Sequence, residues 1–106
     1  MTESRRKHSL SKTITVNEIL ITEIIIDSHV DKHKDHITDD LILSLVLLLD
    51  GRTYSPAKVQ DGFSYFVSKV LYCEKVYRLV WLQQNDQFYI GVVTAFNEKG
   101  ADHDIP

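Results

Sequence analysis

The hydrophobic pattern opens with a β-type stretch. Residues 13–26 (TITVNEILITEIII) are rich in Ile, Val and Thr, and their first half alternates apolar with polar positions. A period of two is typical of a half-buried strand, whereas the spacing of Leu20, Ile24 and Asp27 would also suit a helical turn. We therefore predict a strand here, with a helix as the alternative.

A helix is predicted over residues 39–49. Thr38 is a suitable N-cap because its hydroxyl can accept an amide hydrogen of the first turn, and two aspartates follow it at the positive end of the helix dipole. The apolar run LILSLVLLL ends just before Gly51, and glycine commonly adopts the left-handed conformation that terminates helices. A shorter helix is expected over residues 29–36 (HVDKHKDH), with Ser28 as its N-cap.

The apolar residues of the 39–49 helix lie almost all round its surface. Its main stripe consists of Leu41, Leu45, Leu48 and Leu49. Leu43 and Leu47 lie well away from that stripe, and a helix of this kind is usually covered on several sides. Since a sheet packed on the main stripe would leave Leu43 and Leu47 exposed, we predict that they lie at a homodimer or partner interface.

Three further β-type segments follow the helix. The predicted strands are residues 63–71, 76–82 and 88–96. The polar loop before the last strand is centred on Asn85-Asp86, which are common turn residues, and we expect Phe66, Trp81 and Phe96 on the core face of the sheet. The order of elements predicts an α+β fold in which short helices pack on one antiparallel sheet of about four strands.

Length and composition place this pattern in one small domain. The chain has 106 residues, of which 43% are hydrophobic, enough for one modest core and too many for a disordered or collagen-like chain. We predict a basic flexible arm over residues 1–12, a single domain over 13–97 and a flexible tail over 98–106. A lone cysteine, Cys73, and the absence of any run of about 20 apolar residues predict a cytoplasmic protein with neither a membrane span nor a secretory signal.

The charge is distributed unevenly along the chain. The net charge is −3, but residues 1–12 carry +3 and the remainder, with 8 basic and 14 acidic side chains, carries −6. A basic arm can contact nucleic acid, whereas an acidic body offers no broad field for binding phosphates. The charge of the body therefore favours protein partners over RNA.

Three histidines are the main candidates for chemistry. His29, His33 and His36 share one face of the expected short helix, because steps of four and seven residues return to nearly the same angle. Seven residues advance about 10 Å along a helix axis, so one ion cannot bind all three, and we expect neither a metal site nor a cofactor. Acid–base chemistry by His29, with Lys32 and Arg78 stabilising phosphate charge, is one interpretation. The other is a solvent-exposed polar helix with no catalytic role.

Three short pieces also match a known family. They are His29 with Lys32 and His33, then Ile37-Thr38-Asp39-Asp40, and finally Val93-Thr94-Ala95-Phe96. In these pieces the chain resembles the small ribonuclease toxins of the barnase–EndoU–colicin–RelE superfamily, especially BrnT-like members. The resemblance implies a RelE-like fold and metal-independent RNA cleavage, with RNA and an antitoxin as partners. It also implies catalytic residues: His29 as general acid or base, His33 as its partner, and Arg78 and Lys32 as phosphate stabilisers.

Two functions from different classes follow from the sequence. The first is an RNA-cleaving or RNA-binding domain of the toxin–antitoxin type, as the resemblance implies. The alternative is a non-catalytic protein-interaction module that acts as a homodimer or a partner-bound subunit, as the all-apolar helix and the acidic body indicate.

Overall fold

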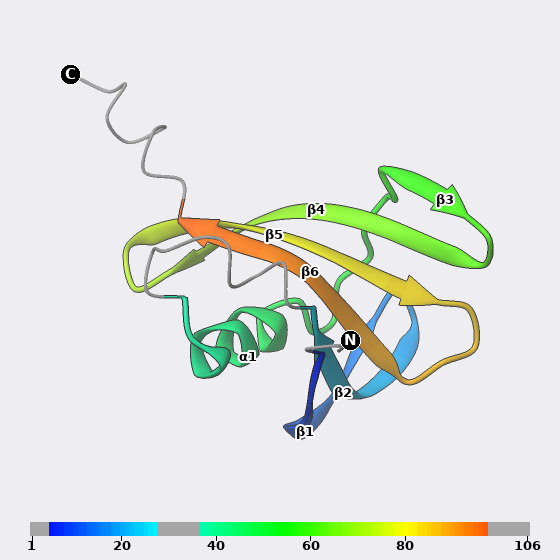
Figure 1. The fold of residues 1–106 in the computed structure, drawn as a ribbon, viewed down its shortest axis with the longest axis horizontal. Helices are drawn as coiled ribbons and strands as arrows, with labels where there is room; N and C mark the ends of the chain where they lie inside the picture. Colours follow the sequence, from blue (N-terminus) through cyan, green and yellow to red (C-terminus); the bar gives the residue numbers. More distant parts are fainter. Residues whose placement is uncertain (1–4, 28–36, 98–106) are drawn as a thin grey trace.

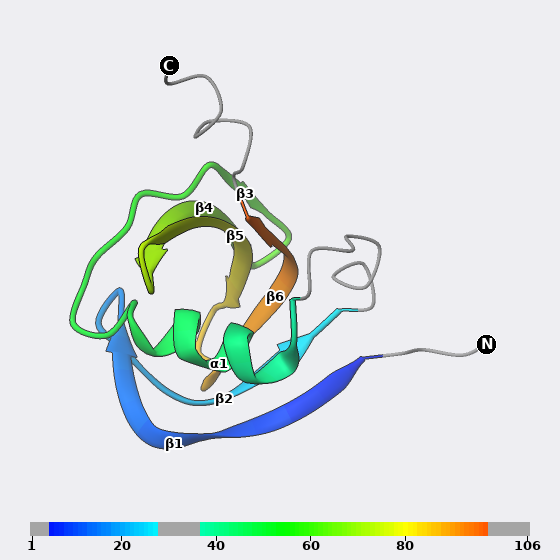
Figure 2. The same ribbon diagram turned by 90° about the vertical axis from the view of Figure 1, so that its left-hand side faces the viewer.

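The computed structural model describes residues 5–27 and 37–97, and in this part of the chain six strands form one strongly curled sheet around a single helix (Figure 1). The elements are β1 (Arg6–Val16), β2 (Ile19–Ile26), α1 (Asp39–Leu47), β3 (Lys58–Gln60), β4 (Phe63–Tyr72), β5 (Lys75–Gln84) and β6 (Tyr89–Asn97). Figure 2 shows that α1 lies within the curl, on the concave side of the sheet. The sheet therefore has the shape of a half-barrel that partly encloses the helix.

The topology of the sheet differs from the prediction. The strand order is β1-β2-β6-β5-β4-β3, and every neighbouring pair is antiparallel except β2 and β6, which are parallel. The predicted α+β fold, with short helices packed on one antiparallel sheet of about four strands, is therefore wrong: the protein is mostly β, and its sheet is six-stranded and mixed. The difference arises because the hairpin of β3 and β4 adds β3 at one end of the sheet, and the hairpin of β1 and β2 adds two strands at the other end. This second hairpin joins the sheet through the parallel pairing of β2 with β6.

The first hairpin occupies the segment predicted as an arm and one strand. β1 begins at Arg6, so residues 6–12 are part of the sheet, and Lys7 forms an ion pair with Glu23 of β2 at 3.1 Å. The chain reverses at Asn17 and Glu18, whose φ angles are 55° and 66°. Two residues with positive φ give the tight turn that matches the twist of a hairpin, and asparagine tolerates this region better than most residues.

The three C-terminal strands are confirmed. β4, β5 and β6 form an antiparallel meander over the predicted segments. The short strand β3 was not predicted, and it joins β4 through Asp61-Gly62, which have φ angles of 54° and 83°. An Asp-Gly pair is a strong hairpin signal, so this strand was open to prediction from sequence.

The concave face of the sheet holds the core. Phe66 and Trp81 are buried there with their rings stacked at 4.2 Å between centroids, and the indole Nε1 donates a hydrogen bond to Ser68 Oγ at 3.0 Å. Their predicted placement is confirmed. The placement of Phe96 is wrong, because its neighbour Ala95 is the buried residue and Phe96 faces outward beside Arg78.

The helix is confirmed, but its buried face is not the predicted one. Thr38 caps the helix by accepting a hydrogen bond from the amide of Leu41 at 3.1 Å, and Gly51 follows the helix with a φ of 80°. The residues buried against the sheet are Ile42, Leu45, Val46 and Leu49. Leu48, which was assigned to the main stripe, is 45% exposed, whereas Leu43 and Leu47 are partly buried and pack against the core.

Candidate functional site

The predicted catalytic residues are not brought together in the described structure. His29, Lys32 and His33 lie outside the described residues, and Arg78 is half-buried on the convex face of β5, with its guanidinium carbon 5.9 Å from the ring centroid of Phe96. Within residues 5–27 and 37–97, no group of three or more His, Cys, Asp or Glu side chains is arranged to hold a metal ion. The site must therefore be sought from the geometry of the sheet.

One line of residues crosses the convex face of the sheet. The strand register aligns Ile25 of β2 with Gly91 of β6, Gly91 with Leu82 of β5, and Leu82 with Tyr65 of β4. The three side chains of this row are half-buried although they face away from the core. Four strands thus place an apolar band on the outer surface of the half-barrel.

Gly91 lies within this band, between Ile25 and Leu82. A groove of about 320 Å³ lies over it, lined by Arg5, Ile25, Asp27, Phe63, Tyr65, Leu82, Tyr89, Gly91, Val92 and Val93. A Cβ atom at Gly91 would lie 2.9 Å from Leu82 Cδ1, so the side chain of Leu82 occupies the space that the glycine leaves. Gly91 therefore lines the groove while the side chain of Leu82 packs closely against it.

The rim of the groove is aromatic. The rings of Phe63 and Tyr65 lie 6.5 Å apart with an interplanar angle of 43°. Tyr89 lies on the other side, and its hydroxyl forms a 3.0 Å hydrogen bond to Gln84 Oε1, which fixes the ring. The charged lining residues are Arg5 and Asp27, and the other lining side chains are aliphatic or aromatic. This groove is suited to binding an apolar group rather than to covalent chemistry.

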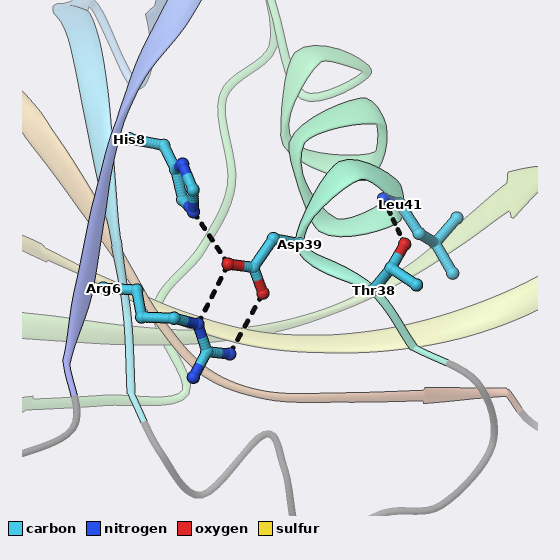
Figure 3. Close-up of polar contacts among 5 residues, drawn as sticks. All are labelled: Arg6, His8, Thr38, Asp39 and Leu41. Carbon is cyan, nitrogen blue, oxygen red and sulfur yellow. Dashed lines mark hydrogen bonds and ion pairs between the residues drawn. The ribbon is translucent and has the colours of Figure 1, made fainter.

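A separate charged cluster joins β1 to the start of α1 (Figure 3). Arg6 donates two hydrogen bonds to Asp39, from Nε to Oδ2 at 2.9 Å and from Nη2 to Oδ1 at 3.0 Å. His8 Nε2 lies 2.8 Å from the same Oδ2. The hydrogen bonds from Arg6 lower the pKa of Asp39 below its ordinary value of 3.8, against the opposing effect of burial, and His8 adds to the lowering.

This cluster is best understood as structural. The two-pronged contact between a guanidinium and a carboxylate is geometrically specific and fixes the N-terminal strand against the helix. Asp39 is the first residue of α1, where a negative charge also interacts favourably with the helix dipole.

The sequence contained one signal for the groove. In β5 three of the outward-facing residues, Val76, Val80 and Leu82, are apolar, and they share this face with Arg78 and Gln84. A strand exposed to water on one side normally alternates with polar residues there. The contribution of β2 was missed because its place beside β6 follows from the parallel pairing of these two strands, which local patterns do not encode.

The comparisons with known proteins add no assignment. No family model, no curated protein and no solved structure matches the chain. The likeness to ribonuclease toxins therefore rests on the three short pieces described above. Within the part of the chain that the structure describes, no helix is long and apolar enough to cross a membrane.

Proposed function

We propose that this protein is a non-catalytic interaction module that binds a partner protein through the convex face of its sheet. The observation that carries the proposal is the apolar band Ile25, Leu82 and Tyr65, which lies outside the core and lines the groove at Gly91. An open sheet with one solvated face is normally polar on that face. Contiguous apolar surface of this kind is typical of interfaces.

The apolar surface continues beyond the groove. Val67 of β4 is 51% exposed and lies directly opposite Val80 of β5, one row further along the convex face. Val93 of β6 lines the groove on the same side. A surface that spans four strands is broader than a small-molecule pocket needs, so its extent favours a protein partner.

The chemistry of the groove defines what it would accept. Its aromatic rim and aliphatic floor suit an aliphatic or aromatic side chain that the partner inserts, as at the anchor positions of many interfaces. Arg5 in the lining supplies a positive charge to orient the partner. The net charge of −3 is also more compatible with a protein than with RNA.

Site-specific photo-crosslinking tests the proposal. A benzophenone amino acid at Tyr65 should capture one defined partner in the cells that make the protein, whereas the same group at Glu74, exposed in the β4–β5 turn, should not. The purified pair should then bind, and Leu82→Lys should weaken binding at least about tenfold because a charge enters the apolar groove. Binding that is unchanged in this variant would contradict the proposal.

The ribonuclease hypothesis is tested on the same preparation. We expect the purified protein to leave single-stranded RNA intact in the presence of EDTA. Cleavage that is lost in His29→Ala would instead identify a metal-independent nuclease, because a general acid or base contributes about 100- to 10,000-fold to the rate.

A further inference from the structure

The groove at Gly91 runs across the strands rather than along them. Its lining residues belong to, or directly flank, β1, β2, β6, β5 and β4, which are neighbours in that order in the sheet. The row Ile25, Gly91, Leu82 and Tyr65 follows the same direction. Four spacings between neighbouring strands amount to about 19 Å. The groove therefore has room for several residues of a partner around one anchor side chain.

The backbone beneath the groove is already paired. Ile25 has a neighbour in β1 and another in β6. Gly91 lies between β2 and β5, and Leu82 lies between β6 and β4. The amides and carbonyls of these residues are directed at the adjacent strands, so a segment in the groove does not meet an open sheet edge. Its affinity has to come from side chains and from the rings at the rim.

This arrangement sets a requirement on the backbone of the occupant. An amide that is pressed against an apolar floor loses its water and gains no acceptor, which weakens binding. Proline has no N–H, and a proline-rich segment adopts the polyproline II conformation, an extended helix without internal hydrogen bonds. Because this conformation is largely formed before binding, little conformational entropy is lost. A proline-rich segment therefore fits this groove better than a β-strand does.

The aromatic rim offers the contacts that proline rings make. Phe63 and Tyr65 lie on β4 with their ring centroids 6.5 Å apart. Tyr89 lies two strands away, and its hydroxyl donates to Gln84 Oε1 at 3.0 Å. Rings beside an aliphatic floor present flat apolar surfaces, as in the aromatic-lined grooves that recognise polyproline II segments. Six residues of such a helix span about 19 Å, which matches the width of the five strands.

One end of the groove is basic. Arg5 is exposed there. Asp27, at the same end, has a polar interaction of its own, and the nearby Lys7 and Glu23 form an ion pair at 3.1 Å. An acidic residue at the corresponding end of the occupant would pair with the guanidinium of Arg5.

The occupant belongs to another protein. The chain contains two prolines, Pro56 and Pro106, which are too far apart in the sequence to lie in one such segment. A second copy of the chain therefore does not supply it. Single-stranded nucleic acid also stacks on aromatic rings, but the charged groups among the described lining residues are one arginine and one aspartate. This is too little positive charge to hold successive phosphates.

We propose that the groove at Gly91 binds a proline-rich segment of the partner in the polyproline II conformation, laid across the strands with an acidic residue beside Arg5. This inference rests on the proposed function, because it uses the same groove and names the chemistry of the partner. The aromatic rim would hold the proline rings, and the charge would orient the segment.

Peptide binding to the full chain tests the inference. The probe is a nine-residue peptide of prolines and leucines with a glutamate at each end, and the matched peptide has alanine at every proline position. In a titration followed by amide NMR signals up to about 1 mM peptide, the proline peptide should bind about tenfold more tightly, because it is preorganised and has fewer amides to desolvate. Equal binding of both peptides, or no binding, would overturn the proposal.

Two pairs of variants locate the bound segment. Phe63→Ala should weaken binding of the proline peptide about tenfold because it removes a ring from the rim, whereas Phe88→Ala, exposed and outside the lining, should leave it unchanged. Arg5→Glu should weaken binding about three- to tenfold. Lys75→Glu, at an exposed position at the far end of β5, makes the same change of charge and is the control. Equal losses within either pair would overturn the proposal.

The crosslinking experiment at Tyr65 distinguishes this inference from the proposed function. Mass spectrometry of the captured partner should identify a crosslinked segment with several prolines and an acidic residue. A captured partner whose crosslinked segment lacks proline would overturn the inference and leave the proposed function in place, whereas capture of no partner would overturn both. Displacement of the proline peptide by a uridine oligonucleotide would overturn the inference in favour of a nucleic acid.

Discussion

At the scale of single residues, Gln83 shows how this small core accommodates a polar side chain. It is only 5% exposed, and its Nε2 donates to the carbonyl of Val16 at 3.1 Å. Its Oε1 accepts from Asn17 Nδ2 at 2.7 Å, and Asn17 Oδ1 in turn accepts from the amide of Tyr54 at 2.6 Å. These bonds connect the first turn and the loop after the helix to the middle of the sheet.

Gln83→Leu should lower the free energy of unfolding by about 2–3 kcal/mol. The leucine leaves the buried carbonyl of Val16 and the half-buried side-chain amide of Asn17 without these hydrogen bonds, and each lost partner is costly. Urea denaturation measures the effect. Gln87→Leu, at an exposed position, should stay within about 0.5 kcal/mol of wild type and is the control. Equal stability of both variants would show that the buried amide is dispensable.

At the scale of elements, the contact between β1 and α1 depends on one carboxylate. Asp39 accepts from Arg6 and lies beside His8, and its pKa is lowered mainly by the hydrogen bonds from Arg6. A carboxyl group whose pKa is lower in the folded state stabilises the fold above its unfolded-state pKa. That stabilisation is lost as the pH falls through the folded-state pKa.

Asp39→Asn should therefore destabilise the protein in a pH-dependent way. At pH 7 we expect a loss of about 1–2 kcal/mol, modest because the contact is partly exposed to solvent. The difference from wild type should shrink as the pH falls below 3.8, where Asp39 of the wild type also becomes protonated. Asp40→Asn is the matched control, since it shares the first helical turn. A difference that is constant between pH 7 and pH 2.5 would contradict the assignment.

The individual helices, strands and turns differ in how well the sequence predicts them. The helix and the strands β4, β5 and β6 were predicted because capping and alternation are local signals. The turn at Asn17-Glu18 was missed because neither residue is glycine, although both have positive φ, and so one strand was expected where a hairpin lies. The Asp61-Gly62 turn was within reach of prediction.

At the scale of the whole molecule, the curl of the sheet around the helix determines which side chains are exposed to solvent. The half-barrel wraps α1 on the concave side, so the helix buries a stripe centred on Leu45 and leaves Leu48 outside. Sequence reasoning could not place that stripe, because the direction from which the sheet covers the helix depends on pairings between distant strands. The contribution of β2 to the groove at Gly91 could not be predicted for the same reason, since it needs β2 beside β6.

In this fold, substitutions at Leu43 and Leu47 are expected to lower stability rather than to separate a dimer. Both side chains pack against the core, so Leu43→Glu with Leu47→Glu should lower the free energy of unfolding by about 2–4 kcal/mol. Leu48→Glu, at an exposed position, should change it by less than about 0.5 kcal/mol. Urea denaturation and light scattering measure both properties. A double variant as stable as wild type with half its molar mass would support the predicted homodimer.

The parallel pairing of β2 with β6 also has a consequence during biosynthesis. Residues 23–26 cannot reach residues 89–92 until the ribosome has released nearly the whole described chain. The isoleucine-rich β2 is therefore without its central neighbour while β3, β4 and β5 are still being made, and closing so long a loop slows folding. We therefore expect the apolar side chains and the open edge of β2 to be exposed in the nascent chain during this interval.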